Sequence, residues 1–250
     1  MNDIFGDLEK RSLDRLKEFE PQEGYYFADS GGKDSCVVRQ LLIDSGCEYD
    51  GHHNLTTADP PEVVWFIRKH HQEVMIHRPE LTMWQLIRKE GMPPRRNARY
   101  CCESQKEGGG AGRLVVTGIR WDESEKRSHR RPMESCYHDP KKTFLHVIID
   151  WPTHAVWEYI RARQVPYCSL YDEGFSRIGC VLCPCVEDVW PYFQRWPQIC
   201  RAWERAIKAT FKEKAEGYGT PEEYWQWWLD RRRSARCKDA EGQMRLFFSD

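Results

Sequence analysis

A short apolar segment, a glycine-rich turn and a helix follow one another near the N-terminus, and this order most restricts how the chain can fold. Residues 24–28 (GYYFA) are predicted to be a buried strand and residues 37–43 (VVRQLLI) a helix. Two glycines let the turn between them take a positive φ and approach a ligand without Cβ atoms in the way. Backbone N–H groups at a helix N-terminus favour an anion. The turn is therefore predicted to bind phosphate through Ser30, Gly31, Gly32, Lys33, Asp34 and Ser35, with the N–H groups of Gly31 to Asp34 turned outward.

The side chains of the turn strengthen this prediction. Lys33 adds a point charge, and the hydroxyls of Ser30 and Ser35 add hydrogen-bond donors. Asp34 is predicted to hold Mg²⁺ or to cap the helix. The turn is not a Walker A loop, which needs four residues between its first glycine and Gly-Lys-Ser/Thr. A helix cap with incidental glycines is the alternative interpretation.

Strand-like and helical segments continue to alternate after this turn. Strands are expected at 52–55, 73–77, 113–117 and 144–149, and helices at 8–19, 61–70, 81–89 and 153–163. This alternation is typical of a parallel sheet with helices on both faces. From residue 186 onward the pattern is helical only, at 186–214 and 221–233. We therefore expect an α/β fold with a doubly wound parallel sheet in residues 1–185, and a helical C-terminal extension in residues 186–250.

Composition limits the class of protein. No apolar run reaches the length of a membrane span, and the charged first 20 residues lack the apolar core of a secretory signal. The formal net charge of −1 excludes a uniformly basic nucleic-acid coat. We expect a cytoplasmic protein without a membrane partner. In that compartment the 11 cysteines point to metal or redox chemistry rather than to disulfides.

The hexapeptide SGGKDS resembles the PP-loop of the superfamily of ATP pyrophosphatases and phosphoadenosine phosphosulfate (PAPS) reductases. Three further blocks resemble that superfamily in the same order: TTADPPE at 56–62, TGIRWDESEKR at 117–127, and the segment from IDWPT to IGC at 149–180. The resemblance covers roughly residues 25–184. It implies a fold of the adenine nucleotide α-hydrolase (HUP) type, a loop that binds nucleotide phosphates, and attack at the α-phosphate.

The same resemblance implies a set of site residues. Thr57 and Gly118 are expected to join the loop in binding the nucleotide. Arg120 and Arg127 carry planar guanidinium groups that suit phosphate or sulfate, although a solvated charged segment is the alternative. The residues expected to carry the reaction are Lys33, Asp34, Arg120 and Arg127.

Two cysteine pairs form the second strong signal. Cys101-Cys102 precedes Cys180-Val181-Leu182-Cys183 by 77 residues, and four thiolates suit a [4Fe–4S] cluster or structural zinc, with buried or redox thiols as a third reading. The arrangement resembles the iron–sulfur signature of adenylylsulfate (APS) reductases, which implies a [4Fe–4S] cluster on these four residues. Cys185 could replace one ligand, or remain a free thiol beside the cluster as a sulfur carrier.

Three functions remain open. In the first, ATP releases pyrophosphate after attack at its α-phosphate, with Mg²⁺, and the adenylate is displaced by sulfur, as in tRNA- or DNA-thiolating relatives. In the second, the protein is an APS or PAPS reductase that releases sulfite. That reaction needs a mobile nucleophilic cysteine near the C-terminus, and the sequence offers Cys237 between Arg236 and Lys238 without the family tail. The third is a nucleotide-binding partner without turnover.

Partners follow from these functions. An adenine nucleotide is expected, together with a sulfur donor such as a cysteine desulfurase or a thioredoxin-like thiol. Basic groups at 95–99, 126–131 and 231–233 make a nucleic acid a further possible partner. Arg231 to Arg233 equally suit the C-terminus of a helix.

Overall fold

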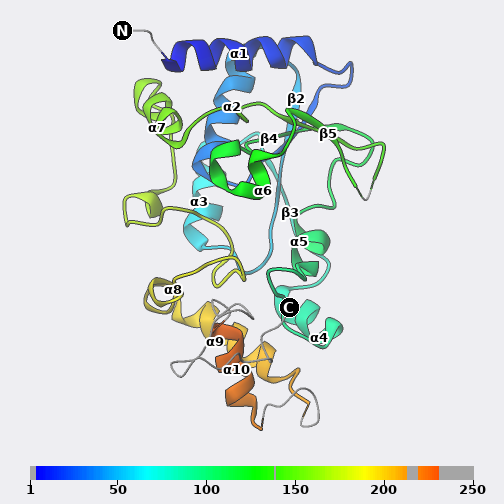
Figure 1. The fold of residues 1–250 in the computed structure, drawn as a ribbon, viewed down its shortest axis with the longest axis vertical. Coiled ribbons are helices and arrows are strands. Elements are labelled where there is room, and N and C mark those ends of the chain that lie inside the picture. The colour runs from blue at the N-terminus through cyan, green and yellow to red at the C-terminus, as the bar shows by residue number, and fades with distance from the viewer. Residues whose placement is uncertain (1–3, 138, 213–218, 231–250) are drawn as a thin grey trace. The chain divides into compact units, whose positions relative to one another are not determined.

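The computed structural model describes residues 4–137, 139–212 and 219–230 (Figure 1). The strands are β1 (Tyr25–Ala28), β2 (Tyr49–Asn54), β3 (Met75–His77), β4 (Leu114–Thr117), β5 (Met133–Ser135) and β6 (Thr143–His146). The α-helices are α1 (Ile4–Glu18), α2 (Lys33–Ser45), α3 (Pro61–His70), α4 (Met83–Glu90), α5 (Tyr100–Gln105), α6 (Glu125–Ser128), α7 (Thr153–Ala162), α8 (Trp190–Arg195), α9 (Pro197–Lys208) and α10 (Pro221–Leu229). Two 3₁₀ turns, η1 (Trp121–Glu123) and η2 (Ser169–Tyr171), complete these elements.

The strands form one six-stranded sheet in the order β3-β2-β1-β4-β6-β5. All neighbouring pairs are parallel except β5 and β6, which are antiparallel. This sheet confirms the expected α/β class. The strand order reverses between β1 and β4, and in such sheets ligands bind outside the carboxyl ends of the strands at this switch point. The turn after β1 lies at that position.

The chain forms two compact units. The first contains residues 1–54, 61–77 and 108–179, and the second contains residues 55–60, 78–107 and 180–250. The second unit includes more than the expected C-terminal extension, because α4 packs against α9 within it. The boundary expected at residue 185 stays a prediction for the division into domains.

The core of the first unit lies between the sheet and its helices. Tyr25 and Phe27 of β1 are fully buried in the middle of the sheet. Helix α2 buries Val37, Val38, Leu41 and Leu42, whose spacing places them on one helical face, and it packs against α1 and α7 (Figure 1). It ends at Gly46, whose φ of 72° is the left-handed conformation of a glycine C-cap. Helix α2, which follows the glycine-rich turn, is therefore held in the core by one apolar face and ends at a glycine.

Tryptophans dominate the core of the second unit. Trp203 of α9 is fully buried, stacks on Trp228 of α10 and meets Trp84 of α4 edge to face. This agrees with a packing role for the C-terminal tryptophans. The helix expected over 186–214 is divided into α8 and α9, because Pro197 begins a new helix after Trp196.

Most expected elements are present within a few residues, but several short elements among the described residues were not expected, including α5, α6 and β5. Helix α5 and strand β5 are short and lack a clear periodic pattern. No helix among the described residues is both long enough and apolar enough to cross a membrane.

Candidate functional site

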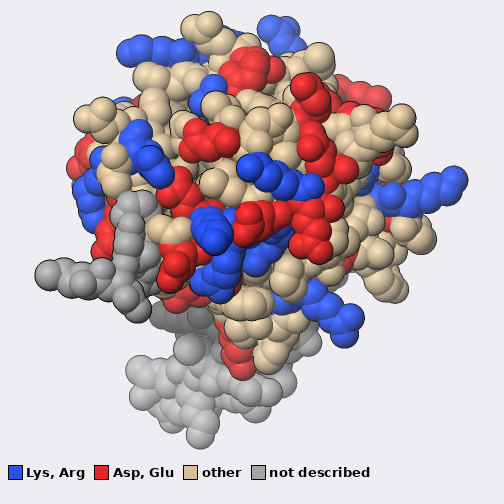
Figure 2. Space-filling view, turned by 90° about the horizontal axis from the view of Figure 1, so that it is seen from above, with Lys and Arg blue, Asp and Glu red and all other residues tan. Residues whose placement is uncertain are grey.

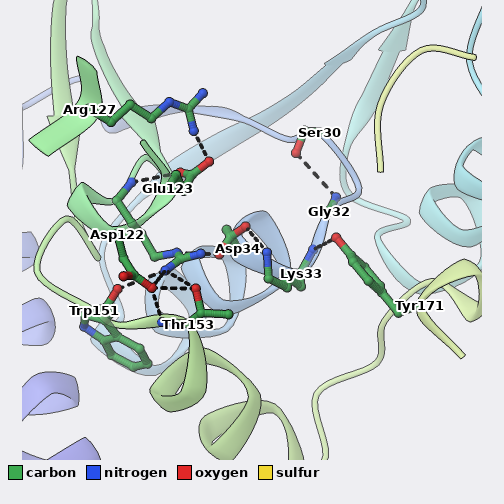
Figure 3. A network of polar contacts seen from close by, with 11 residues as sticks. Ser30, Gly32, Lys33, Asp34, Asp122, Glu123, Arg127, Trp151, Thr153 and Tyr171 are labelled. Carbon is green, nitrogen blue, oxygen red and sulfur yellow. Dashed lines mark hydrogen bonds and ion pairs between the residues drawn. The ribbon is translucent and has the colours of Figure 1, made fainter. Parts of the chain in front are cut away.

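The turn between β1 and α2 is a tight loop at the carboxyl end of β1 (Figure 3). Gly31 has a φ of 67°, and Gly32 is the N-cap of α2 without a side-chain cap. The N–H of Lys33, the first residue of α2, donates to the hydroxyl of Tyr171 at 2.9 Å. The N–H of Gly32 makes a long contact of 3.4 Å with Ser30 Oγ. These two N–H groups lie at the start of α2, where backbone N–H groups favour an anion.

One N–H group of the loop differs from the expectation. The N–H of Gly31 does not turn outward but donates at 2.8 Å to Oδ1 of Asp29, which is buried. It turns inward because an ionised carboxylate is a stronger acceptor than water at the same place.

Two glycines allow the site to close tightly. A Cβ atom on Gly31 would lie 2.7 Å from Val63 Cγ1 and 3.0 Å from Ile67 Cδ1, so α3 packs directly on the loop. A Cβ atom on Gly118 would lie 3.0 Å from the backbone oxygen of Asp34. Gly118, expected to bind the nucleotide, thus lets the end of β4 approach the first turn of α2. A direct nucleotide contact for it stays a prediction.

Lys33, Asp34 and Arg120 form a chain of ion pairs (Figure 3). The ammonium of Lys33 lies 2.9 Å from Asp34 Oδ2, and Nε of Arg120 donates to Oδ1 of the same carboxylate at 2.7 Å. Both oxygens of Asp34 therefore face cations. Charge alternates from plus to minus to plus along the chain, so the three groups carry a net positive charge beside the loop.

Arg120 is held from several sides. Its side chain is 2% exposed, and Nη1 donates to the backbone oxygen of Trp151 at 3.0 Å and to Thr153 Oγ1 at 3.2 Å. The guanidinium therefore faces protein oxygens and not an open surface. The alternative interpretation, a solvated charged segment, is therefore wrong for Arg120, whose buried guanidinium needs such acceptors.

Arg127 lies one step further along the same network. It donates to the carboxylate of Glu123, which in turn accepts from the backbone N–H of Arg120 at 3.0 Å (Figure 3). Arg127 is about one-third exposed. It is linked to Arg120 through Glu123, and its role toward phosphate or sulfate stays a prediction.

A buried carboxylate lies directly beneath the loop. Asp29 follows β1, and its side chain is fully buried together with the ring of His71, whose Nδ1 lies 2.6 Å from Asp29 Oδ2. Burial by itself would raise the pKa of Asp29. The hydrogen bond and the positive charge of His71, with hydrogen bonds from Ser35 and Gly31, outweigh it and lower that pKa. Asp29 is thus an ionised group at neutral pH.

A histidine ends the neighbouring strand at the same edge of the sheet. Thr117 of β4 pairs with His146 of β6, and their side chains meet at 2.6 Å from Oγ1 to Nδ1. His146 is fully buried, and its Nε2 makes no hydrogen bond with the described residues. Burial lowers the pKa of His146 to about 4, although Glu134 opposes this shift. The ring is therefore neutral at neutral pH.

The four cysteines predicted as ligands lie in the second unit. Cys101 and Cys102 begin α5, and their side chains are hydrogen-bonded to each other. Cys180 and Cys183 lie in an irregular segment, in which the N–H of Cys183 donates to the oxygen of Cys180 at 3.1 Å. The charges of Cys180 and Cys183 both act on Cys101. The fold therefore brings together two pairs that are 77 residues apart in the sequence.

The segment around Cys180 is fixed by hydrogen bonds. Thr56 Oγ1 lies 3.3 Å from Cys180 Sγ and 2.8 Å from a carboxylate oxygen of Asp59. The N–H of Val181 donates to Ala58 at 2.7 Å, and Trp203 Nε1 donates to Val181 at 2.8 Å. The positions of these thiols are thus set by the surrounding protein.

The thiols act on one another electrostatically. The hydrogen bond from Cys101, with Lys106 and Arg99 nearby, lowers the pKa of Cys102 to about 7, against the effect of burial. The same hydrogen bond, together with burial, raises the pKa of Cys101. A hydrogen bond with Cys185, together with burial, raises the pKa of Cys183. The pKa values of these neighbouring thiols are therefore shifted in opposite directions, raised for Cys101 and Cys183 and lowered for Cys102.

No three His, Cys, Asp or Glu side chains among the described residues form a group suited to one metal ion. A [4Fe–4S] cluster binds four cysteines, each at a different iron. Four cysteines are the residue type that such a cluster needs, and the cluster itself stays a prediction. Cys185 lies beside Cys183 and is hydrogen-bonded to it, so it also belongs to this group.

Thr57 also lies in the second unit. It has a φ of 61°, and its hydroxyl accepts a hydrogen bond from the N–H of Met83 at 2.8 Å, at the start of α4. The hydroxyl thus holds the N-terminus of α4. Its expected contact with the nucleotide stays a prediction.

The family of the chain follows from a comparison of its sequence with known families. The phosphoadenosine phosphosulfate reductase domain matches residues 25–186. The chain belongs to this family. The match includes the loop, the Lys33–Asp34–Arg120 chain and all five clustered cysteines, so each of these features lies inside the PAPS reductase domain.

Curated relatives of this PAPS reductase-family chain are of two kinds. An uncharacterized protein of Methanocaldococcus jannaschii is 26% identical over 224 residues, which cover 80% of this chain and 45% of that protein. A second uncharacterized protein of that organism is 29% identical, covering 78% of this chain and 53% of its own length. The chain thus spans about half the length of these two relatives. Adenosine 5'-phosphosulfate reductase 2 of Bacillus subtilis is 28% identical over 169 residues, covering 64% of this chain and 68% of that enzyme.

Solved structures support the fold. PAPS reductase of Candida auris, in a phosphate complex, has a TM-score of 0.53 at 18% identity and covers 72% of this chain and 95% of its own. FMN adenylyltransferase of Candida glabrata, with FAD and inorganic pyrophosphate, has a TM-score of 0.53 at 15% identity and covers 72% of this chain and 66% of its own. The PAPS reductase-family chain therefore has the expected HUP-type fold.

Sequence reasoning missed three residues of the loop's surroundings: Asp29, His71 and Tyr171. An aspartate at the end of an otherwise apolar strand was the available signal for Asp29. Tyr171 lies in the block that carried the resemblance, but the contact of its hydroxyl with Lys33 joins residues 138 positions apart. Cys237 and Arg231 to Arg233 lie outside the described residues.

Proposed function

We propose that the chain binds ATP at the loop of residues 30–35 and promotes attack on its α-phosphate with release of pyrophosphate. The observation that carries this proposal is the Lys33–Asp34–Arg120 chain of ion pairs beside the loop. It places a positive ammonium next to the loop, and positive charge there is what stabilising a polyphosphate and its leaving group requires. Here the protein's contribution is positioning and charge neutralisation, since the nucleophile is an oxygen of the substrate.

Magnesium fits this proposal through the nucleotide. Mg²⁺ usually keeps several waters and binds one or two carboxylates together with substrate phosphates. Asp34 is the candidate carboxylate, and it would exchange one of its two cationic partners for the ion. Lys33, released from Asp34, would then face the phosphates.

The cysteine group supports a second half-reaction. We assign a [4Fe–4S] cluster to Cys101, Cys102, Cys180 and Cys183, which the cluster would hold as thiolates. Bound there, it would supply the soft-metal chemistry of sulfur transfer. The adenylated substrate would then lose AMP to a sulfur nucleophile from a donor such as a cysteine desulfurase or a thioredoxin-like thiol. The thiolated acceptor is proposed to be a nucleic acid or a small molecule.

A nucleic-acid acceptor would need a basic surface. Figure 2 shows blue and red side chains interspersed on the face in view. Some basic residues of the expected groups have acidic partners, with Arg130 3.1 Å from Glu134 and Arg96 3.5 Å from Glu187. A small-molecule acceptor is accordingly an equal alternative.

The second candidate function is reduction of APS or PAPS to sulfite. The matches to adenosine 5'-phosphosulfate reductases favour it, and so does the Arg120–Arg127 block. In that reaction a cysteine thiolate attacks sulfur, AMP leaves from APS or adenosine 3',5'-bisphosphate leaves from PAPS, and a second thiol releases sulfite as a disulfide forms. A nucleotide-binding partner without turnover is the third candidate.

Two assays distinguish these functions. Exchange of labelled pyrophosphate into ATP, with Mg²⁺ and candidate acceptors, measures adenylation, and thiol-dependent sulfite release from APS measures reduction. We expect pyrophosphate exchange that Lys33→Ala lowers by about 100-fold and that Cys237→Ser leaves unchanged. Sulfite release that Cys237→Ser abolishes would instead establish the reductase. Nucleotide binding without either activity would leave the non-catalytic function.

A further inference from the structure

The carboxylate of Asp29 connects the two ends of the phosphate loop. Oδ1 accepts hydrogen bonds from the N–H of Gly31, at 2.8 Å, and from the hydroxyl of Ser35. Ser35 Oγ also accepts from the N–H of Ser30 at 3.1 Å. The beginning of the loop and the first turn of α2 are therefore joined through one buried oxygen.

The second oxygen of Asp29 is held by a different element. Oδ2 lies 2.6 Å from Nδ1 of His71, and because an ionised carboxylate only accepts, the proton of that hydrogen bond belongs to Nδ1. His71 is 2% exposed and directly follows α3, since its N–H donates to Ile67 at 2.8 Å. Its ring lies edge to face against Phe66. The direction of the imidazole is thus fixed by α3.

Helix α3 therefore reaches the loop in two ways. Val63 and Ile67 fill the space that a side chain at position 31 would occupy. His71, one helical turn after Ile67, supplies a polar contact from the same side of the helix. An apolar contact sets how close the helix and loop lie, and a hydrogen bond sets the orientation of the carboxylate.

A buried anion beneath an anion-binding loop is electrostatically unfavourable by itself. It repels the phosphate and is costly to remove from water, so its presence needs a compensating role. That role is to accept hydrogen bonds from Gly31 and Ser35, two residues of the loop itself. By holding these donors, the carboxylate of Asp29 sets the shape of the loop.

We propose that Asp29 and His71 are positioning residues for nucleotide binding: the Asp29 carboxylate holds the loop in its phosphate-binding shape, and the Nδ1–H of His71 holds the carboxylate. This inference rests on the proposed function only in requiring that the loop bind a nucleotide. Neither residue needs to touch the nucleotide.

The test uses variants of His71 that differ in where they can donate. Asparagine places its amide nitrogen close to the position of Nδ1, whereas glutamine places it near Nε2. The affinity for ATP with Mg²⁺ is measured by calorimetry on the full chain at pH 7. We expect His71→Asn to bind within about threefold of wild type, and His71→Gln and His71→Ala to bind about tenfold or more weakly.

Variants of Asp29 test the other half of the pair. Asp29→Ala removes the shared acceptor and is expected to weaken ATP binding by about tenfold or more, whereas Asp29→Asn keeps one acceptor oxygen and is expected to lose less. The matched control is Asp44→Asn at the opposite end of α2, where the carboxylate accepts from Gln40 and Tyr159. It is expected to bind ATP as wild type does.

The outcomes separate this inference from the function on which it rests. Equal affinity of His71→Asn and His71→Gln would overturn the positioning role, and so would wild-type affinity of Asp29→Ala. If Asp29→Ala fails to fold, the two His71 variants decide, because both keep the carboxylate. Wild-type protein that binds ATP but shows no pyrophosphate exchange overturns only the proposed reaction. Wild-type protein that binds neither ATP nor APS overturns both.

Discussion

Arg120 is a buried charged residue in the first unit, and its guanidinium joins several segments of the chain. Its guanidinium meets Asp34, the backbone oxygen of Trp151 and the hydroxyl of Thr153. A planar fork with several donors can satisfy these acceptors at once, and an ammonium cannot. The same contacts hold Asp34, and through it Lys33. At the scale of a single residue, stability and site geometry therefore depend on one side chain.

The first prediction follows from this arrangement. Arg120→Lys keeps the charge but loses the fork, so we expect the free energy of unfolding to fall by about 2 kcal/mol and ATP to bind more weakly. Urea unfolding followed by circular dichroism measures the stability. Arg127→Lys is the matched control, because its ion pair with Glu123 is partly exposed and is expected to change stability by less than about 1 kcal/mol. Equal losses in the two variants would contradict the buried role of Arg120.

The second prediction concerns His146 and pH. Its folded pKa of about 4 lies below the ordinary 6.5, so between these values the unfolded chain binds more protons than the folded one. Stability is therefore expected to fall as pH decreases from 6.5 toward 4, by on the order of 3 kcal/mol from this group. His146→Gln removes the titration and should flatten this part of the pH profile of the urea midpoint. A profile as steep as that of wild type would contradict the assignment.

Helix α2 has a glycine with positive φ near each end, and the two glycines serve different purposes. Gly31 precedes the helix in the loop, where α3 leaves no space for a side chain, whereas the Cβ position of Gly46 after the helix meets no atom within 4 Å. A side chain at either position would be strained by the left-handed backbone to a similar extent. Only at Gly31 would it also clash with neighbouring side chains. At the scale of the element, the beginning of α2 is thus specified more strictly than its end.

The third prediction compares these two positions. Gly46→Ala is expected to cost about 1 kcal/mol for its left-handed backbone and to leave ATP affinity unchanged. Gly31→Ala adds a clash with Val63, so we expect a loss of about 2 to 3 kcal/mol and at least about a tenfold loss of ATP affinity. Unfolding and calorimetry measure both effects. Similar losses at the two glycines would show that α3 yields and that the close approach is unimportant.

At the scale of the molecule, the two candidate sites lie in different units. The phosphate loop and the Lys33–Asp34–Arg120 chain lie in the first unit, and the clustered cysteines lie in the second. The contacts described above for the loop all lie within the first unit, and those described for the cysteines all lie within the second. Changes that remove the proposed cluster are therefore expected to leave the fold of the phosphate loop unchanged.

The fourth prediction tests this separation. Protein purified without oxygen is expected to be brown, to absorb broadly near about 400 nm and to contain about four irons per chain. Serine at Cys101, Cys102, Cys180 or Cys183 should each bleach it, because serine is a poor ligand for soft metals, while calorimetric ATP affinity stays within about threefold of wild type. Bleaching by Cys185→Ser but not by Cys101→Ser would replace one ligand. One zinc and no iron would rule out the cluster.

The sequence by itself determined the class of fold, and it predicted a phosphate-binding loop. The alternation of apolar strands and amphipathic helices, and two glycines between the first strand and its helix, are local patterns read over a few residues. The order of the motif blocks added the family, and the match of the PAPS reductase domain to residues 25–186 confirmed it. The strands, the helices and the glycine turn can be predicted from the sequence because hydrophobic periodicity and backbone conformation depend on residues that are neighbours in the chain.

Tertiary structure alone decided what the charged residues do. Arg120 is paired with Asp34, 86 positions away, and Asp29 is joined to His71 across 42 positions. Gly118 packs against Asp34, and Thr57 accepts a hydrogen bond from Met83. Both contacts join residues that are far apart in the sequence. A charged side chain takes the partner that folding brings to it, because leaving it unpaired in the interior is too costly, and that partner is not encoded in its own segment.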